Sequence, residues 1–400
     1  MSRTNGTDIA DGSGPSPIAG LARKAVLLAG ADGCAPTRSR VLLSVLQELT
    51  HEVVVVGGSL APSTGFEPPG VSVAEFDFGS HWRNPVREGL EAWKLARILE
   101  AESADLVHIV GLEAAALACL AFKLAPVKHA IVHLPDLGPL ESAASGLSRP
   151  YRTLALKLLA SLMRKPTSFL LVEGEGDLAD LRARGIEPGA RFAVLGGAGI
   201  DPDVYPVMPP SQYEMPIAAF VGPVVEANGI RTLLRAFERL WARGVRLQLE
   251  LFGERDAESA ADISSGEWDR WNLHPGVRCS GWPADVREVW RRAEICVWPA
   301  QSRQGLPHVL LEAAACGRAL IVTDVPGGGS FVRDGIEGLI VPSRDASALA
   351  AALERLARDS SLRLRMGAAA RMRVLQSFTE AHVKEALRGA YLSLLGSRRW

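Results

Sequence analysis

Residues 301–342 read QSRQGLPHVLLEAAACGRALIVTDVPGGGSFVRDGIEGLIVP, a succession of loop, helix, buried strand, glycine-rich turn and second strand. Pro307 stands where a helix begins, an apolar stripe with helical spacing follows, and Gly317 ends the helix. The apolar run at 319–322 is typical of a strand inside a parallel sheet. Glu312 interrupts the apolar helix with a carboxylate. We expect this carboxylate near the carboxyl ends of the strands, where open α/β sheets bind ligands.

The alternation of short apolar runs and amphipathic segments continues along the chain on the amino-terminal side of this stretch. Strands are predicted at 25–30, 52–57, 72–76, 105–110, 130–133 and 168–172, and again at 217–222, 247–251 and 294–298. Such alternation predicts parallel sheets that are covered by helices on both faces. Between the two series, residues 201–216 contain five prolines, which suit a linker better than a strand or a helix.

The segment around Glu312 resembles the donor-site signature of family 4 glycosyltransferases, which are retaining enzymes with the GT-B fold. That signature has two glutamates eight positions apart, and here Glu312 keeps the second while Gln304, a neutral isostere, stands at the first. The run GAGID at 197–201 matches a Gly-x-Gly-Val-Asp turn that these enzymes carry just before the hinge. The resemblance covers most of the chain from Lys24. Within the family, the segment resembles most closely that of enzymes that build bacterial polysaccharide on lipid carriers.

The resemblance implies a GT-B architecture, an α/β fold in which two doubly wound, Rossmann-like parallel-sheet domains face a cleft. The divisions that we expect are a disordered tail at 1–22, an acceptor-side domain at 23–205, a proline-rich hinge at 206–216, a nucleotide-sugar domain at 217–379 and a last helix at 380–400. The resemblance also implies that this last helix returns to the first domain.

The charged residues that hold the donor in this family are largely replaced. A nucleotide-sugar donor carries a diphosphate, whose charge must be held as it leaves. The family has an arginine after the first strand of the second domain and a lysine at the start of the next helix, where this chain has Pro223 and Asn228. Losing two cations without replacement would cost ~10⁴ or more in rate. Arg231 and Arg303 are candidate replacements, although each is also explained as a solvated arginine.

The candidate site residues follow from the resemblance and from their positions next to predicted strands. Gln304 and His133 are the candidate catalytic residues, and a strand-end histidine bonded to a backbone carbonyl is the alternative for His133. Asp32 and Gly33 are candidates on the acceptor side, although an ordinary βα turn also explains them. The candidate donor-binding residues are Glu312, Gly305, Leu306, Gly222, Asn228, Gly229, Arg231, Arg303 and Gly199.

An acidic cluster after the strand at 168–172 is interpreted differently. Glu173, Glu175 and Asp177 lie where a helix is expected to start. Carboxylates favour helix amino-termini, so we interpret the three mainly as a helix-start feature.

The composition narrows the classes of partner. The chain has 400 residues, of which 48% are hydrophobic and 22% charged, and this describes a globular protein large enough for two domains. A net charge of −1 gives no electrostatic reason to expect a nucleic-acid partner. The five cysteines are scattered without metal-ligand spacing, which favours reduced thiols in the cytoplasm. No metal and no cofactor is expected, because the nucleotide-sugar is a substrate.

One tract suggests contact with a membrane surface. Between Arg149 and Lys165, five basic residues alternate with leucines, a pattern typical of an amphipathic helix on an anionic membrane. A half-buried domain helix is the alternative interpretation. The expected location is the cytoplasm, with peripheral contact at the inner face of the membrane.

Three functions remain open from the sequence. The first is a retaining glycosyltransferase that moves a sugar from a nucleotide-sugar to a polysaccharide precursor or lipid-linked acceptor. The second is a catalytically degraded homologue that acts as a binding or scaffold subunit of a polysaccharide assembly system, as the neutral residues Pro223, Asn228, Gln304 and Ser330 suggest. The third, a nucleotide-sugar epimerase on the same architecture, is disfavoured by the transferase-like signature. Binding of nucleoside diphosphates would separate the first two.

Overall fold

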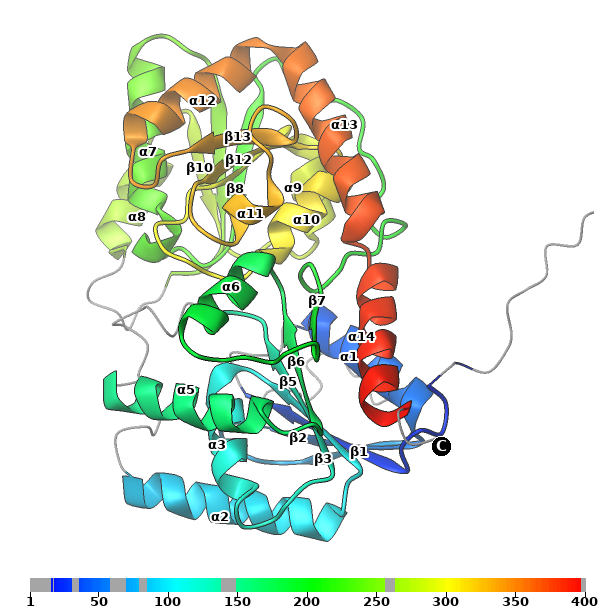
Figure 1. The fold of residues 1–400 in the computed structure, drawn as a ribbon. Coiled ribbons are helices and arrows are strands. Elements are labelled where there is room, and N and C mark those ends of the chain that lie inside the picture. The colour runs from blue at the N-terminus through cyan, green and yellow to red at the C-terminus, as the bar shows by residue number, and fades with distance from the viewer. Residues whose placement is uncertain are drawn as a thin grey trace, which may run out of the picture.

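Two parallel β-sheets, one in each half of the chain, form the framework of the computed structural model (Figure 1). The structure describes residue 16 and residues 18–30, 36–57, 70–78, 85–137, 149–255 and 263–396. Neighbouring strands in both sheets pair in parallel. The predicted α/β class, with two parallel-sheet domains, is confirmed.

The first sheet has seven strands in the order β3-β2-β1-β4-β5-β6-β7. The central strands β4, β5 and β6 are buried along their whole length, as expected for strands covered on both faces. The seven strands are β1 (Lys24–Ala29), β2 (Glu52–Val56), β3 (Val71–Ala74), β4 (Leu106–Val110), β5 (His129–Leu134), β6 (Ser168–Val172) and β7 (Phe192–Val194).

Helices cover both faces of this sheet with separate hydrophobic cores. One core includes α2 (Pro85–Glu102), α3 (Leu112–Ala121), α5 (Arg149–Met163) and α6 (Glu175–Ala183). The other includes α1 (Pro36–Leu49) and α14 (Glu380–Leu395). Ile18 and Ala22 are buried in this second core, so the first domain also takes in residues 18–22, part of the expected tail. The rest of that tail, residues 1–15 and 17, lies outside the described residues.

The second sheet has six strands in the order β10-β9-β8-β11-β12-β13 and one continuous core. Its strands are β8 (Ile217–Val221), β9 (Gln248–Phe252), β10 (Val277–Ser280), β11 (Ile295–Trp298), β12 (Ala319–Thr323) and β13 (Gly338–Val341). The helical segments around it are the 3₁₀ turn η1 (Glu226–Asn228), α7 (Ile230–Ala242), α8 (Ser265–Asn272), α9 (Val286–Arg292), α10 (His308–Ala315), α11 (Gly328–Phe331), α12 (Ala346–Arg358) and α13 (Ser360–Ser377).

The chain crosses between the domains twice, and the two crossings are hydrogen-bonded to each other. The Ile200 N–H donates to the Phe378 carbonyl over 3.0 Å, and the Glu380 N–H donates to the Ile200 carbonyl over 2.9 Å. After the second crossing, α14 lies beside α1 on the first domain (Figure 1). The Tyr391 hydroxyl of α14 is hydrogen-bonded to His108 Nδ1 of β4 over 2.9 Å. The last helix is therefore part of the core of the first domain.

Among the described residues, no helix has the length and apolar character needed to span a bilayer.

Candidate functional site

A cavity of about 440 Å³ lies between the domains, at the carboxyl ends of their strands. The first domain contributes Glu173 and the start of α6, and the second contributes the loops that follow β11 and β12. The volume falls within the range of small-molecule sites, roughly 300–1,000 Å³. Gln304 and Leu306, two of the predicted site residues, line this cavity together with Ser330.

The loop that carries Gln304 lies directly on the first domain. A Cβ atom at Gly305 would be 2.4 Å from the carbonyl oxygen of Pro135, which follows β5, so only glycine lets the two backbones approach this closely. On its other side the loop contacts the turn after β12, where the Gln304 N–H donates to the Pro326 carbonyl over 3.4 Å. Gln304 therefore lies at the point where the domains meet.

Arg303, one residue earlier, joins the domains through an ion-pair cluster. Its Nη1 lies 3.1 Å from Asp177 Oδ1, and its Nη2 pairs with Asp180 Oδ2; both aspartates belong to α6. The Arg303 side chain is only 8% exposed. Burial raises the pKa of Asp177, and Arg303 opposes that effect. The candidate replacement cation is thus engaged by carboxylates of the first domain.

Glu312 lies in the second turn of α10 and faces the linker. Its Oε1 accepts a hydrogen bond from the Tyr205 hydroxyl over 3.1 Å and lies 3.0 Å from His308 Nδ1. His308 Nε2 lies 3.0 Å from the carbonyl oxygen of Gly199, at the first crossing. Both partners of the imidazole are acceptors, so both bonds form together only when each ring nitrogen carries a proton. Glu312 and Gly199 are therefore linked through one histidine.

The positions expected to hold the diphosphate form a neutral corner at the end of β8. Asn228 is buried, and its Nδ2 donates to the Pro223 carbonyl over 2.8 Å. Gly222 packs against the Trp298 ring. Gly229 has φ +76°, and a Cβ there would be 1.9 Å from the Pro299 carbonyl oxygen, so this position requires glycine. The corner presents backbone and an amide to a ligand, and neither Pro223 nor Asn228 brings a charge.

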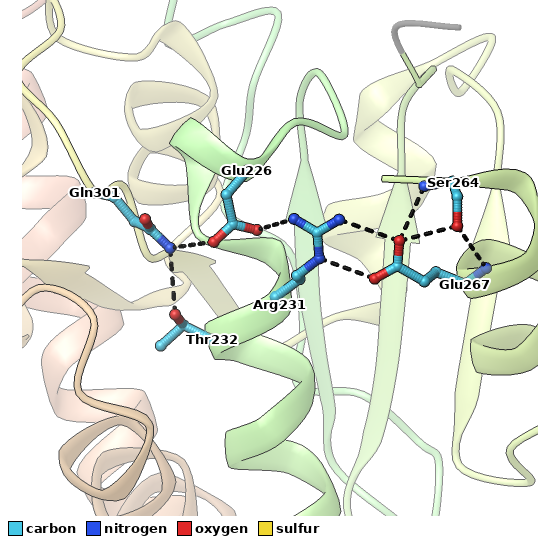
Figure 2. Close-up of polar contacts among 6 residues, drawn as sticks. All are labelled: Glu226, Arg231, Thr232, Ser264, Glu267 and Gln301. Atoms are coloured by element: carbon cyan, nitrogen blue, oxygen red, sulfur yellow. Dashed lines mark hydrogen bonds and ion pairs between the residues drawn. The ribbon is translucent and has the colours of Figure 1, made fainter. Parts of the chain in front are cut away.

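Arg231, the other candidate cation, is held between two carboxylates (Figure 2). Its Nε and Nη2 donate to the two Glu267 oxygens over 2.9 and 3.1 Å, and its Nη1 donates to Glu226 Oε2 over 3.0 Å. Gln301 Nε2 donates to the other Glu226 oxygen over 2.8 Å. Ser264 caps α8 and binds Glu267. Hydrogen bonding to Glu267 raises the pKa of Arg231, and Arg231 lowers the pKa of Glu267 to about 2.

His133 lies at the end of β5 within a buried polar cluster that the sequence did not predict. Its Nε2 is 3.9 Å from Glu173 Oε1, and both residues are almost fully buried. Arg38 of α1 donates to the same oxygen from Nε and Nη2 over 3.1 and 2.5 Å. Burial lowers the pKa of His133 well below its usual range and raises that of Glu173. Neither ring nitrogen of His133 has a hydrogen-bond partner, in contrast to the carbonyl-bonded alternative.

The cavity thus brings together only part of the predicted set. Gln304 and Leu306 line it, Gly305 lies between them against Pro135, and His133 lies beside Glu173 without lining the cavity. The acceptor-side candidates Asp32 and Gly33 lie outside the described residues. Across the part of the chain that the structure describes, no group of three or more His, Cys, Asp and Glu residues is placed to hold a metal ion.

Both halves of the chain match known glycosyltransferase domains. Residues 33–196 match the family described as "Glycosyl transferase 4-like domain", and residues 215–359 match "Glycosyl transferases group 1". Residues 197–214, which include most of the linker, lie between the two matched segments.

Two curated relatives act in the synthesis of bacterial surface polysaccharides, according to their names. The chain is 33% identical over 194 residues to the lipopolysaccharide core biosynthesis glycosyltransferase LpsE of Rhizobium meliloti (strain 1021), a match that covers 46% of this chain and 51% of that protein. It is 29% identical over 179 residues to the capsular polysaccharide biosynthesis glycosyltransferase CapM of Staphylococcus aureus, covering 45% and 46%. Each match spans about half the length of the relative.

Solved structures share the arrangement of both domains. Anabaena Alr3699/HepE, solved in complex with UDP and glucose, superposes with a TM-score of 0.72 at 16% identity and covers 93% of this chain and 100% of that one. Sucrose-phosphate synthase from Thermosynechococcus elongatus gives a TM-score of 0.75 at 18% identity, covering 94% and 100%. At these identities the likeness concerns the fold, and it confirms the predicted GT-B architecture.

Proposed function

We propose that this chain, which belongs to the GT-B glycosyltransferases by its two matched domains and its fold, transfers a sugar from a nucleotide-sugar to a polysaccharide precursor or lipid-linked acceptor. The observation that carries the proposal is the cavity between the domains, where the Gln304 loop of the second domain meets Glu173 of the first. The names of LpsE and CapM support a polysaccharide acceptor, and the HepE complex with UDP and glucose supports a nucleotide-sugar donor.

The transfer that we infer retains the configuration of the sugar. The acceptor hydroxyl attacks from the face that the diphosphate leaves, and the leaving phosphate takes the proton of that hydroxyl. This scheme needs neither a protein nucleophile nor a metal ion or other cofactor. The Gln304 amide, which can both donate and accept, binds a hydroxyl of the donor sugar. His133 lies on the opposite wall, behind Glu173.

The donor site that we propose has lost most of the charge that the family places there. The first turn of α7 holds the diphosphate through its backbone N–H groups, since a helix amino-terminus favours an anion. Glu312 binds the ribose. Arg231 and Arg303 take part only if they leave their carboxylate partners, because both guanidiniums are already paired.

A peripheral membrane contact through α5 completes the proposal. Leu158, Leu159 and Leu162 are buried in the domain core, so most of the apolar face of α5 is covered. The outward positions carry Lys157 and, just past the helix, Arg164 and Lys165, all exposed. The contact is therefore mainly electrostatic, with anionic lipid headgroups as partners.

The direct test is release of nucleoside diphosphate from a panel of nucleotide-sugars in the presence of glycan and lipid-linked acceptors. We expect release by the wild type and a loss of about 10–10²-fold in kcat/KM in Glu312→Gln, because a charge-assisted hydrogen bond to the ribose, worth ~1.5–3 kcal/mol, is replaced by a neutral one. Glu238→Gln is the control, since Glu238 is an exposed carboxylate on α7.

The alternative, a binding or scaffold subunit, rests on the neutral corner of Pro223 and Asn228 together with Gln304. Calorimetry with UDP, GDP and ADP separates the two functions. Micromolar binding of one diphosphate favours the transferase. No heat at millimolar diphosphate, together with no nucleotide release from any donor, would leave the scaffold as the better account.

A further inference from the structure

Glu173 is a buried carboxylate whose hydrogen bonds are only half satisfied. It follows β6 directly and is 4% exposed. Arg38 donates twice to its Oε1, so that oxygen is fully engaged. Its Oε2 is buried and has no hydrogen-bond partner. The helix-start interpretation is confirmed for Glu175 and Asp177, which lie in the first turn of α6. It does not fit Glu173, because Asp177 is the residue that accepts from the Gly174 N–H at the start of α6, over 3.1 Å.

His133 adds two more unsatisfied atoms to the same wall. Both of its ring nitrogens are buried without a partner, and Nε2 lies 3.9 Å from Glu173 Oε1. A buried polar atom without a partner is unfavourable and calls for an explanation, such as a bound ligand or water. Here three such atoms, two on His133 of β5 and one on Glu173 just after the neighbouring strand β6, lie together at the carboxyl edge of the sheet. That edge is where α/β domains bind ligands.

The interdomain cavity lies next to this cluster, and the Gly305 backbone covers it. Glu173 lines the cavity opposite Gln304, and a Cβ at Gly305 would be 3.5 Å from Glu173 Oε2. A molecule in the cavity reaches Oε2 once the loop moves away from Pro135. It would then lie between a carboxylate from the first domain and an amide from the second.

We propose that Glu173 is a sugar-binding residue that contributes to donor specificity: its Oε2 accepts a hydrogen bond from a hydroxyl of the transferred sugar. Arg38 is its positioning residue, because it fixes the carboxylate through two donors on one oxygen. A carboxylate repels a phosphate but accepts strongly from a hydroxyl, so the partner is the sugar and not the diphosphate. This inference rests on the proposed function.

The experiment measures how much the sugar adds to nucleotide binding. Isothermal titration gives dissociation constants for UDP, UDP-glucose, UDP-galactose, UDP-N-acetylglucosamine, GDP and GDP-mannose. The variants are Glu173→Gln, which keeps the shape of the side chain, and Glu187→Gln as the matched control, since Glu187 is an exposed carboxylate that follows α6 in the same domain and does not line the cavity. Thermal melting of each variant confirms that it is folded.

We expect one nucleotide-sugar to bind the wild type more tightly than its free diphosphate. Glu173→Gln should reduce that advantage by about 10-fold or more, because a charge-assisted hydrogen bond is replaced by a neutral one. In Glu173→Gln, affinity for the free diphosphate should change by less than about 3-fold, and Glu187→Gln should match the wild type. The advantage in the wild type should also fall as the pH is lowered, because protonation removes the carboxylate acceptor.

Two other kinds of outcome would overturn the assignment of Glu173 to the sugar, and they distinguish a failure of this assignment from a failure of the proposed function. If Glu173→Gln keeps the full advantage, or if no sugar of the panel adds affinity to a diphosphate that binds, Glu173 does not bind the sugar while the proposed transferase stands. If no diphosphate and no nucleotide-sugar binds the wild type, the proposed function fails and this inference fails with it.

Discussion

Arg231 and Asn228 are three residues apart, but neither gives a diphosphate an uncompensated positive charge. Arg231 keeps its proton, since its carboxylate partners raise its pKa, yet Glu226 and Glu267 together outweigh its charge. Asn228 uses its amide N–H on the Pro223 carbonyl. A charged residue near a predicted site is therefore not evidence of a charged site until its partners are known.

The first prediction restores the missing charge. In the double variant Pro223→Arg with Asn228→Lys, two cations replace the neutral corner, and the hydrogen bond between those residues is lost. Each charge-assisted contact contributes ~1.5–3 kcal/mol, so we expect nucleoside diphosphate to bind ~10²-fold or more tightly. Isothermal titration with the same diphosphates measures this.

The control for that double variant is Pro223→Ala with Asn228→Ala, which removes the hydrogen bond from Asn228 to the Pro223 carbonyl without adding charge. It should bind diphosphate no more tightly than the wild type. Equal affinity of the charged and the alanine variants, both folded, would mean that the phosphates lie away from this corner.

At the scale of elements, the long periodic segments were predictable and the short ones were not. The strands at 25–30, 52–57 and 168–172 lie within one residue of β1, β2 and β6, since a continuous apolar run signals a covered strand. β7 and β10 were missed. β7 has only three residues, all half-buried, and β10 has only four, of mixed exposure, so both are too short for a period to show.

The site was less predictable than the fold, because its contacts join distant parts of the chain. Gln304 and Gly305 could be located because the signature is a short run of consecutive residues. Glu173 was interpreted as a helix start, since its partner Arg38 lies 135 residues away and no local pattern connects them. The same holds for Arg303 and Asp177, which are 126 residues apart. Only the folded chain shows which charges neutralise each other.

The second prediction concerns α5. Its exposed surface is basic and carries Leu154, which is 43% exposed. The triple reversal Lys157→Glu, Arg164→Glu and Lys165→Glu should weaken binding to vesicles of 30% phosphatidylserine. Each basic residue near an anionic surface contributes ~1 kcal/mol, so we expect a loss of ~10²-fold or more at low salt. Co-sedimentation measures the bound fraction.

A matched control reverses three exposed arginines of the second domain, Arg235, Arg270 and Arg365. It changes the net charge equally but leaves α5 intact. If both triple variants lose binding to the same extent, the vesicles sense net charge, and α5 is only a domain helix.

At the scale of the whole molecule, polar contacts join the two domains at the hinge and at the cavity. The crossings at Ile200 and Phe378 form a paired hinge, and Arg303 joins α6 at the cleft. Domains joined by interfaces of this kind are expected to move relative to each other. Because the Gly305 loop covers Glu173, a donor that reaches Glu173 requires such a movement.

The last prediction is that Arg303 holds the closed arrangement. In Arg303→Ala, Asp177 is left partly buried without its guanidinium, and separation of the domains lets water reach the carboxylate. Truncating one partner of a buried charge pair typically costs ~2–5 kcal/mol, which opening would relieve. We expect a larger radius of gyration by small-angle X-ray scattering.

The control is Arg287→Ala, which breaks a surface pair with Asp285 inside the second domain and should scatter like the wild type. Adding Asp177→Asn with Asp180→Asn to Arg303→Ala removes the unpaired charge and should return the scattering toward that of the wild type. Identical scattering of Arg303→Ala and Arg287→Ala would mean that the apolar contacts and the hinge alone set the arrangement.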